Sequence, residues 1–110
     1  ATFSGEMAGH YNDLSGAVSG DINLTVSFSG NANTRLEGSF TINGINGDIP
    51  STQISGPAGF QVDMSTDDLR TGGLQGSFFG TDAEEVGGVW VLGDNADGTG
   101  ATSGRFKAKR

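Results

Sequence analysis

Apolar and polar residues alternate with a period of two along most of the chain. The pattern is clearest over residues 22–29, where Ile, Leu, Val and Phe alternate with Asn, Thr and Ser, and it recurs over residues 35–43 and 60–65. Successive side chains of a β-strand point to opposite faces of the sheet, so each stretch predicts a strand with one buried face. The whole pattern predicts eight strands, at residues 2–11, 18–29, 34–43, 49–55, 59–65, 72–79, 87–93 and 101–109.

Short polar segments separate the predicted strands. Those at residues 12–16, 30–33, 43–47 and 94–98 are rich in Gly, Asn and Asp, which favour hairpin turns. No stretch of the sequence has the apolar period of a helix over three turns. Strands joined by short turns are antiparallel neighbours, and eight of them with one apolar face close readily into a barrel. The sequence therefore predicts one all-β domain over residues 1–110, a single eight-stranded antiparallel up-and-down β-barrel (a meander), with a two-sheet sandwich as the alternative.

The alternation also predicts which side chains fill the barrel. The predicted inward apolar residues are Phe3, Met7, Tyr11, Ile22, Leu24, Val26, Phe28, Leu36, Phe40, Ile42, Phe60, Val62, Met64, Leu74, Phe78, Val89, Val91 and Phe106. The predicted inward glycines, which let strands bend sharply and leave room for Phe rings, are Gly5, Gly9, Gly38, Gly76 and Gly104. These side chains would fill an eight-stranded interior. We therefore expect any ligand to bind on the loops or the outer wall.

Composition and charge narrow the classes of partner. The chain has 110 residues, of which 20 are glycine, and a formal net charge of −7. This charge repels nucleic acid and anionic membrane surfaces over most of the molecule, so neither is an expected partner. Four of the six basic residues lie at 105–110, a pattern typical of the solvated outer face of a last strand. The chain contains no cysteine, and hence neither a disulfide nor a Cys-based metal site.

The start of the sequence bears on how the chain is expected to be produced. It begins at Ala1 without a signal peptide or an apolar run of membrane-spanning length, and is interpreted as a processed protein or an excised domain. Any lipid-anchor cysteine would then lie upstream. We expect the domain to be a monomer.

Two adjacent carboxylates lie in a connection that is fenced by glycines. Residues 76–88 read Gly-Ser-Phe-Phe-Gly-Thr-Asp-Ala-Glu-Glu-Val-Gly-Gly. Glu84 and Glu85 alone do not set the carboxylate separation that a glycosidase needs, and no catalytic residue is expected. The favoured interpretation is a structural lock. The glycines supply special backbone angles or close approaches, and at least one carboxylate accepts hydrogen bonds from turn N–H groups that the strand ladder leaves free.

His10 and Trp90 are the other candidate site residues. His10, the only histidine, has the outward parity of its predicted strand. A lone exposed histidine usually has no function, but haem iron needs one proximal nitrogen and an apolar shelf, so His10 is a haem-ligand candidate. Trp90 faces outward if Val89 and Val91 face inward, and an exposed Trp is a common interface anchor; a core Trp under the preceding loop is the alternative.

The segment 76–88 resembles a family signature. Its pattern, Gly-x-Phe-aromatic-Gly-x-x-Ala-Glu-Glu-apolar-Gly-Gly, is similar to that of the C-terminal β-barrels of transferrin-binding protein B and its relatives, which are bacterial surface lipoproteins and secreted haem carriers. The matching residues are Phe78, Phe79, Gly80, Ala83, Glu84, Glu85, Gly87 and Gly88. A looser likeness includes Ser-Gly-Asp-Ile-Asn-Leu-Thr-Val at residues 19–26 and Gly-Thr-Gly-x-x-Ser-Gly-x-Phe-x-Ala-Lys at residues 98–109.

The resemblance implies a function as well as a fold. It implies an eight-stranded barrel exported by a Gram-negative bacterium, secreted or associated with the outer membrane at the cell surface, that captures haem, transferrin, haemoglobin or another host molecule. The handle domain and lipidated N-terminus of a full-length receptor are missing from this sequence, so transferrin binding by the barrel alone is not expected. Two functions stay open: a non-enzymatic binding domain for haem or a host protein, and a structural or spacer module of a larger secreted protein or adhesin.

Overall fold

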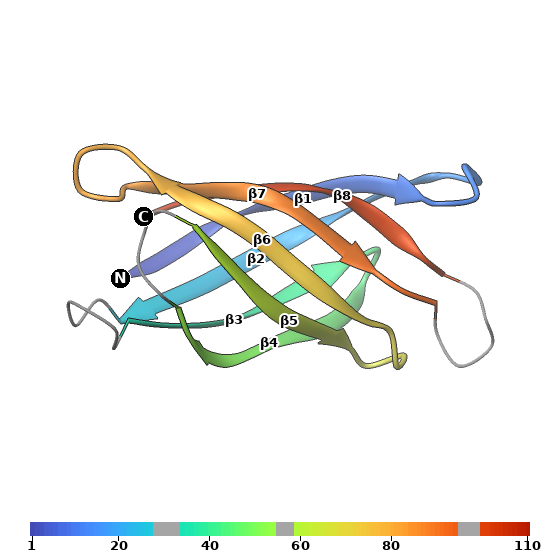
Figure 1. Cartoon of the computed structure of the whole chain (residues 1–110). Helices are drawn as coiled ribbons and strands as arrows, with labels where there is room; N and C mark the ends of the chain where they lie inside the picture. Colours follow the sequence, from blue (N-terminus) through green and yellow to red (C-terminus); the bar gives the residue numbers. More distant parts are fainter. Residues whose placement is uncertain (28–33, 55–58, 95–99) are drawn as a thin grey trace.

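Eight β-strands form one closed barrel in which each strand pairs antiparallel with the next and β8 pairs with β1 (Figure 1). The computed structural model describes residues 1–27, 34–54, 59–94 and 100–110. The strands are β1 (Thr2–Tyr11), β2 (Ala17–Ser27), β3 (Arg35–Ile42), β4 (Ile45–Gln53), β5 (Phe60–Thr66), β6 (Thr71–Phe79), β7 (Glu85–Leu92) and β8 (Thr102–Lys109). The predicted fold class is confirmed, and the sandwich alternative is wrong because the β1–β8 pairing closes the sheet.

The strand boundaries differ from the predicted ones mainly at β4 and β7. The predicted five-residue turn at 43–47 is a two-residue turn, in which Asn43 and Gly44 have φ angles of 48° and 83°. Two consecutive positive φ angles match the twist of a hairpin, so β4 begins directly afterwards at Ile45. β7 begins at Glu85, earlier than predicted. The predicted turns at 30–33 and, apart from Asp94, at 94–98 lie outside the described residues.

One apolar core fills the interior of the barrel. The buried apolar side chains are Phe3, Met7, Val18, Ile22, Leu24, Val26, Leu36, Phe40, Ile42, Ile49, Ile54, Phe60, Val62, Met64, Leu74, Val86, Trp90, Leu92, Phe106 and Ala108. Tyr11 and Phe78 are partly buried against them. The predicted inward set is confirmed except at Val89 and Val91, which are exposed, and at Phe28, which lies outside the described residues. Side chains thus occupy the space where a lipocalin-like barrel holds its ligand.

Inward glycines allow the strands and the aromatic rings to come close together. A Cβ on Gly9 or Gly104 would lie 2.0 Å and 1.9 Å, respectively, from a carbonyl oxygen of the neighbouring strand. A Cβ on Gly76 would lie 2.9 Å from the Phe106 ring and 3.1 Å from the Phe60 ring. The predicted space for Phe rings is confirmed at Gly76, and Gly9 and Gly104 allow a close approach of the neighbouring strand. The predicted role of the inward glycines in strand curvature stays a prediction.

The seam between β4 and β5 is the least paired in the described part of the barrel. Two residue pairs join these strands there, Gly47 with Thr66 and Asp48 with Ser65, whereas the β2–β3 and β5–β6 seams each have six. Just beyond these pairs the register between β3 and β4 shifts, in the interval of β4 that contains Pro50. Proline has no N–H to donate and is tolerated in sheets at such irregular positions.

The barrel is elongated, with principal extents of 42 × 22 × 19 Å, and its two ends differ (Figure 1). One end carries both chain termini and the β6–β7 turn at residues 80–84; we call it the terminal end. The opposite end carries the β1–β2, β3–β4 and β5–β6 turns. We call it the leucine end, after Leu14 and Leu69 in its first and third turns.

Candidate functional site

The β6–β7 turn, which contains the glycine-fenced carboxylates, is closed by its backbone. Gly80 has a φ of 91° and Ala83 a φ of 53°, and the Ala83 N–H donates to the Gly80 carbonyl oxygen over 3.3 Å. A Cβ on Gly80 would also lie 2.5 Å from a carboxylate oxygen of Glu84. The prediction that Gly80 supplies a special backbone angle is confirmed.

The carboxylates of Glu84 and Glu85 do not close this turn. Both side chains are exposed, and within the described ranges no hydrogen bond joins either carboxylate to a turn N–H. The backbone carbonyl of Glu84 instead accepts a hydrogen bond from the Arg110 N–H over 3.0 Å, which ties the turn to the end of β8. The predicted carboxylate lock has no support in the structure, where the hydrogen bonds found at the turn join backbone groups.

Gly87 and Gly88 differ in their contribution. A Cβ on Gly88, which faces inward, would lie 1.9 Å from the Gln75 carbonyl oxygen of β6, so the predicted close approach is confirmed there. Gly87 faces outward, where a Cβ would lie 3.3 Å from the Phe106 carbonyl oxygen and 3.6 Å from the Phe79 ring. The absence of a side chain at Gly87 leaves a dip in the outer wall.

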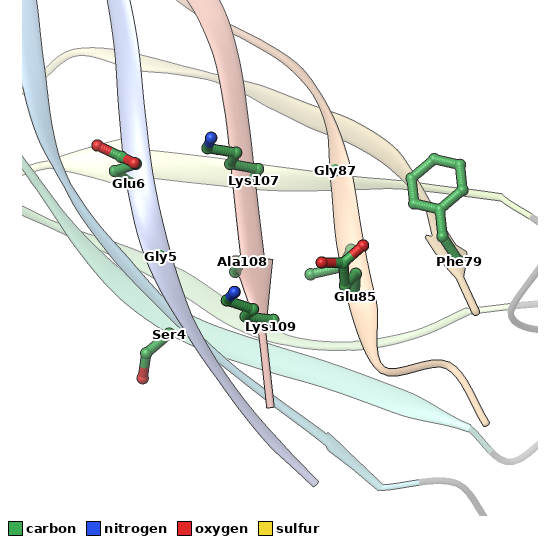
Figure 2. Close-up of a pocket in the computed structure, with 10 residues that line it drawn as sticks. Ser4, Gly5, Glu6, Phe79, Glu85, Gly87, Lys107, Ala108 and Lys109 are labelled. Atoms are coloured by element: carbon green, nitrogen blue, oxygen red, sulfur yellow. The ribbon is translucent and has the colours of Figure 1, made fainter. Parts of the chain in front are cut away.

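This dip belongs to a groove of about 350 Å³ on the outer wall, formed by β1, β8, β7 and the end of β6 (Figure 2). Its charged lining residues are Glu6, Lys107, Lys109 and Glu85, and Phe79, which is 54% exposed, adds an apolar edge. Lys107 pairs across strands with Glu6, and Lys109 with Glu85. Such opposite-charge neighbours stabilise a sheet by about 0.2–1 kcal/mol. The groove therefore suits a ligand that carries both a charged group and an apolar group.

His10 faces outward on β1, as predicted. It pairs with Ser103 of β8, which in turn pairs with Val91 of β7, so the three residues form a row across the outer wall. The next row contains Ala8 and Arg105. The surroundings of His10 therefore offer two apolar side chains and a cation, which fits one axial haem ligand beside an apolar shelf. The role of His10 as a haem ligand stays a prediction.

The expectation that Trp90 faces outward is wrong. Trp90 is 1% exposed, whereas Val89 and Val91 are 53% and 54% exposed. The indole N–H donates to the Arg105 carbonyl oxygen over 3.2 Å, and Gly104 of β8 pairs with Trp90 and adds no side chain. Burying an indole removes more apolar surface from water than burying a valine, and the bond satisfies its N–H. Trp90 is thus a core residue, and its proposed use as an interface anchor loses its premise.

Arg70, which the sequence interpretation did not single out, is buried at the leucine end. Its Nε donates to an Asp68 carboxylate oxygen over 3.0 Å and its Nη1 to the Gly100 carbonyl oxygen over 2.8 Å. The Thr66 hydroxyl donates to the same carboxylate oxygen of Asp68. Burial raises the pKa of Asp68, but the hydrogen bonds from Thr66 and Arg70 and the positive charge of Arg70 together hold it below its ordinary value. Arg70 thus joins the β5–β6 turn to the residues that lead into β8.

The described residues contain no group of three or more His, Cys, Asp or Glu side chains arranged to hold a metal ion. They also contain no helix with the length and apolar character needed to cross a membrane.

Comparisons of the chain with models of protein families, with curated proteins and with solved structures found no match. The likeness to transferrin-binding protein B barrels therefore rests on the residues quoted for it.

Proposed function

We propose that this barrel is a non-enzymatic binding domain of a bacterial cell-surface or secreted protein, and that it captures a host iron source such as haem, haemoglobin or transferrin. It acts outside the cell, at the outer membrane or in the medium of a Gram-negative bacterium. The likeness of residues 76–88 to the transferrin-binding protein B signature supports this lineage. The single structural observation that supports a binding role concerns the two surfaces of the barrel. Side chains fill the interior, so a ligand would contact the outer wall.

The wall of β7, β8 and β1 has the composition of a contact surface. Val89 and Val91 are more than half exposed, and between them and β1 runs the outer face of β8, with Arg105, Lys107 and Lys109. Single exposed apolar residues are ordinary on a protein surface, but here two valines share one face of β7 and Val89 pairs with Arg105, on a chain with a net charge of −7. Lys107 and Lys109 lie further along β8, where they pair with Glu6 and Glu85. An apolar ligand with carboxylate groups matches that combination.

Haem is such a ligand, and the residues present fit it. His10 offers the nitrogen, Ala8 and Val91 offer apolar surface, and Arg105 offers a cation for a propionate. When bound, haem would supply the iron that is the cargo of the domain. The chain's own residues would orient the ring and neutralise its carboxylates.

The test is a haem titration followed by the Soret band. Wild type should shift the band at one equivalent, and His10→Ala should lose the shift while retaining its far-ultraviolet circular dichroism. Ser39→Ala, at an exposed position on β3, is the matched control and should behave as wild type. Immobilised haemoglobin and transferrin test the protein ligands in the same series. A wild-type domain that binds neither haem nor either protein would overturn the proposal.

The second candidate function is a structural or spacer module of a larger secreted protein or adhesin. The filled interior and the short described turns favour it, because they give a stable body without a deep binding cavity. The titration distinguishes the two functions. A spacer gives no Soret shift and captures neither haemoglobin nor transferrin, yet it unfolds cooperatively and is as stable as a binding domain.

A further inference from the structure

Three hairpin turns of the barrel have different lengths but share one local feature. In each, the fourth residue donates its N–H to the carbonyl of the first: Leu14 to Tyr11 over 2.9 Å, Leu69 to Thr66 over 3.1 Å, and Ala83 to Gly80 over 3.3 Å. The fourth residue has a positive φ in every case, 64° at Leu14, 70° at Leu69 and 53° at Ala83. Hairpins of this kind need a left-handed residue after the turn, and glycine is the residue that adopts this conformation at least cost.

Leucine is an unfavourable choice for this position. A bulky side chain at positive φ is a true outlier among L-residues, because its Cβ crowds the following carbonyl. Burial does not offset this strain, since Leu14 is 81% exposed and Leu69 is 71% exposed. Stability therefore does not explain why leucine occupies both positions. Strained conformations of this type concentrate at functional sites, and the inference runs from the observed strain to a function.

Both leucine turns lie at the same end of the barrel and are anchored to the same short segment. The Asn12 N–H donates to the Ala101 carbonyl oxygen over 2.9 Å, and Arg70 Nη1 donates to the adjacent Gly100 carbonyl oxygen over 2.8 Å. Figure 1 shows the β1–β2 and β5–β6 turns projecting at this end. The two leucines are therefore held in a defined relative position, which lowers the entropy cost of binding both at once.

Carboxylates accompany both leucines. Exposed Asp13 precedes Leu14, and exposed Asp67 lies close before Leu69. The one cation in the turns of this end, Arg70, is buried and paired with Asp68. Two apolar knobs with acidic neighbours are complementary to a surface with apolar pockets and a basic rim. The same carboxylates disfavour insertion of the leucines into an anionic lipid surface.

We infer that Leu14 and Leu69 form a docking surface for a basic protein partner that receives the two leucines in apolar pockets. The inference rests on the proposed binding role, but it does not depend on which iron source the domain captures. It assigns recognition to the leucine end, away from the outer-wall groove, which lies toward the terminal end. His10, the second-last residue of β1, lies close to the leucine end, and the two proposals use different residues.

The first test concerns stability. Leu14→Asn and Leu69→Asn keep a side chain, and Asn tolerates the left-handed region. If the leucines are retained for binding, each substitution should leave the melting temperature unchanged or raise it by about 2–5 °C, and the double variant by more. Ala83→Gly is the matched control at the left-handed fourth position of the turn at the terminal end, and it should also be stabilised. A fall of several degrees in either leucine variant would overturn the inference, since it would give the leucines a structural role.

The second test concerns binding. A phage-displayed library of random 16-residue peptides is selected on the immobilised full chain, with counter-selection on the Leu14→Asn/Leu69→Asn double variant. Enriched peptides should carry Lys or Arg together with aliphatic or aromatic residues. They should bind wild type and Ala83→Gly at least about tenfold more tightly than the double variant, and more weakly at high salt.

Three results would overturn the inference: no enrichment over the double variant, enriched peptides without basic residues, or leucine-dependent cosedimentation with phosphatidylcholine vesicles. The last result would indicate a lipid surface as the partner. Failure of the haem and iron-carrier experiments leaves this selection unaffected, and failure of this selection leaves the outer-wall experiments unaffected. The two proposals can therefore fail separately.

Discussion

Each end of the barrel contains a turn whose fourth residue is left-handed, and the two ends place different residues at that position. At the terminal end the left-handed position holds Ala83, a small residue that is half-buried. At the leucine end it holds Leu14 and Leu69, both strongly exposed. A positive φ is common to the three positions, whereas the size and the exposure of the side chain differ between the two ends. The glycine and carboxylate pattern that resembles a family signature belongs to the terminal end, whereas the less conspicuous leucines are the residues that local stability does not explain.

The two ends also differ in how their charged groups are used. Glu84 and Glu85 at the terminal end are exposed and make no described hydrogen bond to the turn, which is held by the backbone. At the leucine end Asp68 and Arg70 form an ion pair in which the Arg70 side chain is 4% exposed. Backbone hydrogen bonds close the turns at both ends, and the leucine end adds a buried ion pair.

Gly88→Ala should give the largest effect, a loss of about 3 kcal/mol or more in the free energy of unfolding. The added Cβ would lie 1.9 Å from the Gln75 carbonyl oxygen, so β6 and β7 must move apart. Urea denaturation measures the loss. Gly73→Ala is the control, because its Cβ would meet the Val62 carbonyl oxygen at an ordinary 3.5 Å, and its stability should change by less than about 1 kcal/mol. Equal effects of the two substitutions would contradict the role assigned to Gly88.

Arg70→Met should destabilise the leucine end by about 2–3 kcal/mol. It keeps an unbranched side chain but removes the hydrogen bonds to Asp68 and to the Gly100 carbonyl oxygen. Arg35→Met is the control, since Arg35 is exposed on β3 and bonds to Ser51, and it should cost less than about 1 kcal/mol. Chemical denaturation of both variants gives the comparison. If Arg35→Met proved the more damaging change, the buried ion pair would not be the anchor of this end.

The free energy of unfolding should fall as the pH is lowered, because Asp68 takes up a proton. Its pKa in the folded chain is below the ordinary value of 3.8, so in the acid range the unfolded chain binds more protons than the folded one. The stabilisation is fully present above about pH 5 and is lost as the pH falls through the folded pKa. Urea midpoints measured from neutral to acid pH should therefore drop more steeply for wild type than for Asp68→Asn. Parallel curves for the two proteins would show that Asp68 does not carry this dependence.

Glu84→Ala and Glu85→Ala should have the smallest effects, each within about 0.5 kcal/mol of wild type. Both carboxylates are exposed, and Glu85 loses only its cross-strand pairing with Lys109. Thermal unfolding measures both. A loss of more than about 1 kcal/mol from Glu84→Ala would restore the carboxylate lock that the sequence suggested.

Most of the fold could be predicted because period-two alternation records a physical fact, the burial of one face of each strand. It failed in β7, where Val89, Trp90, Val91 and Leu92 are apolar at both parities. Which residues of β7 face inward depends on the neighbouring strands. Leu74 of β6 and Gly104 of β8 pair with Trp90, and both lie outside β7 in the sequence.

The candidate site was less predictable than the fold. Arg70 follows Asp-Asp-Leu and looks like an ordinary turn residue, and only its bond to Gly100, thirty positions away, makes it a buried anchor. The Glu84 and Glu85 hypothesis assumed that a carboxylate accepts from a turn N–H group, but the turn is closed by the bond from the Ala83 N–H to the Gly80 carbonyl oxygen. The signal that would have flagged the leucine end was present in the sequence: Asp-Leu occurs at 13–14 and 68–69, where hairpin turns favour glycine.

The sparse pairing between β4 and β5 has a consequence for chain connectivity. The first and last strands are neighbours, and the Arg110 guanidinium lies 5.6 Å from the Phe3 ring centroid, so the two chain ends lie at the same point of the wall. A circular permutant that joins these ends with a short linker and opens the chain between β4 and β5 would keep all the well-paired seams. The permuted chain would carry its new ends at the seam with the fewest residue pairs in the described part of the barrel.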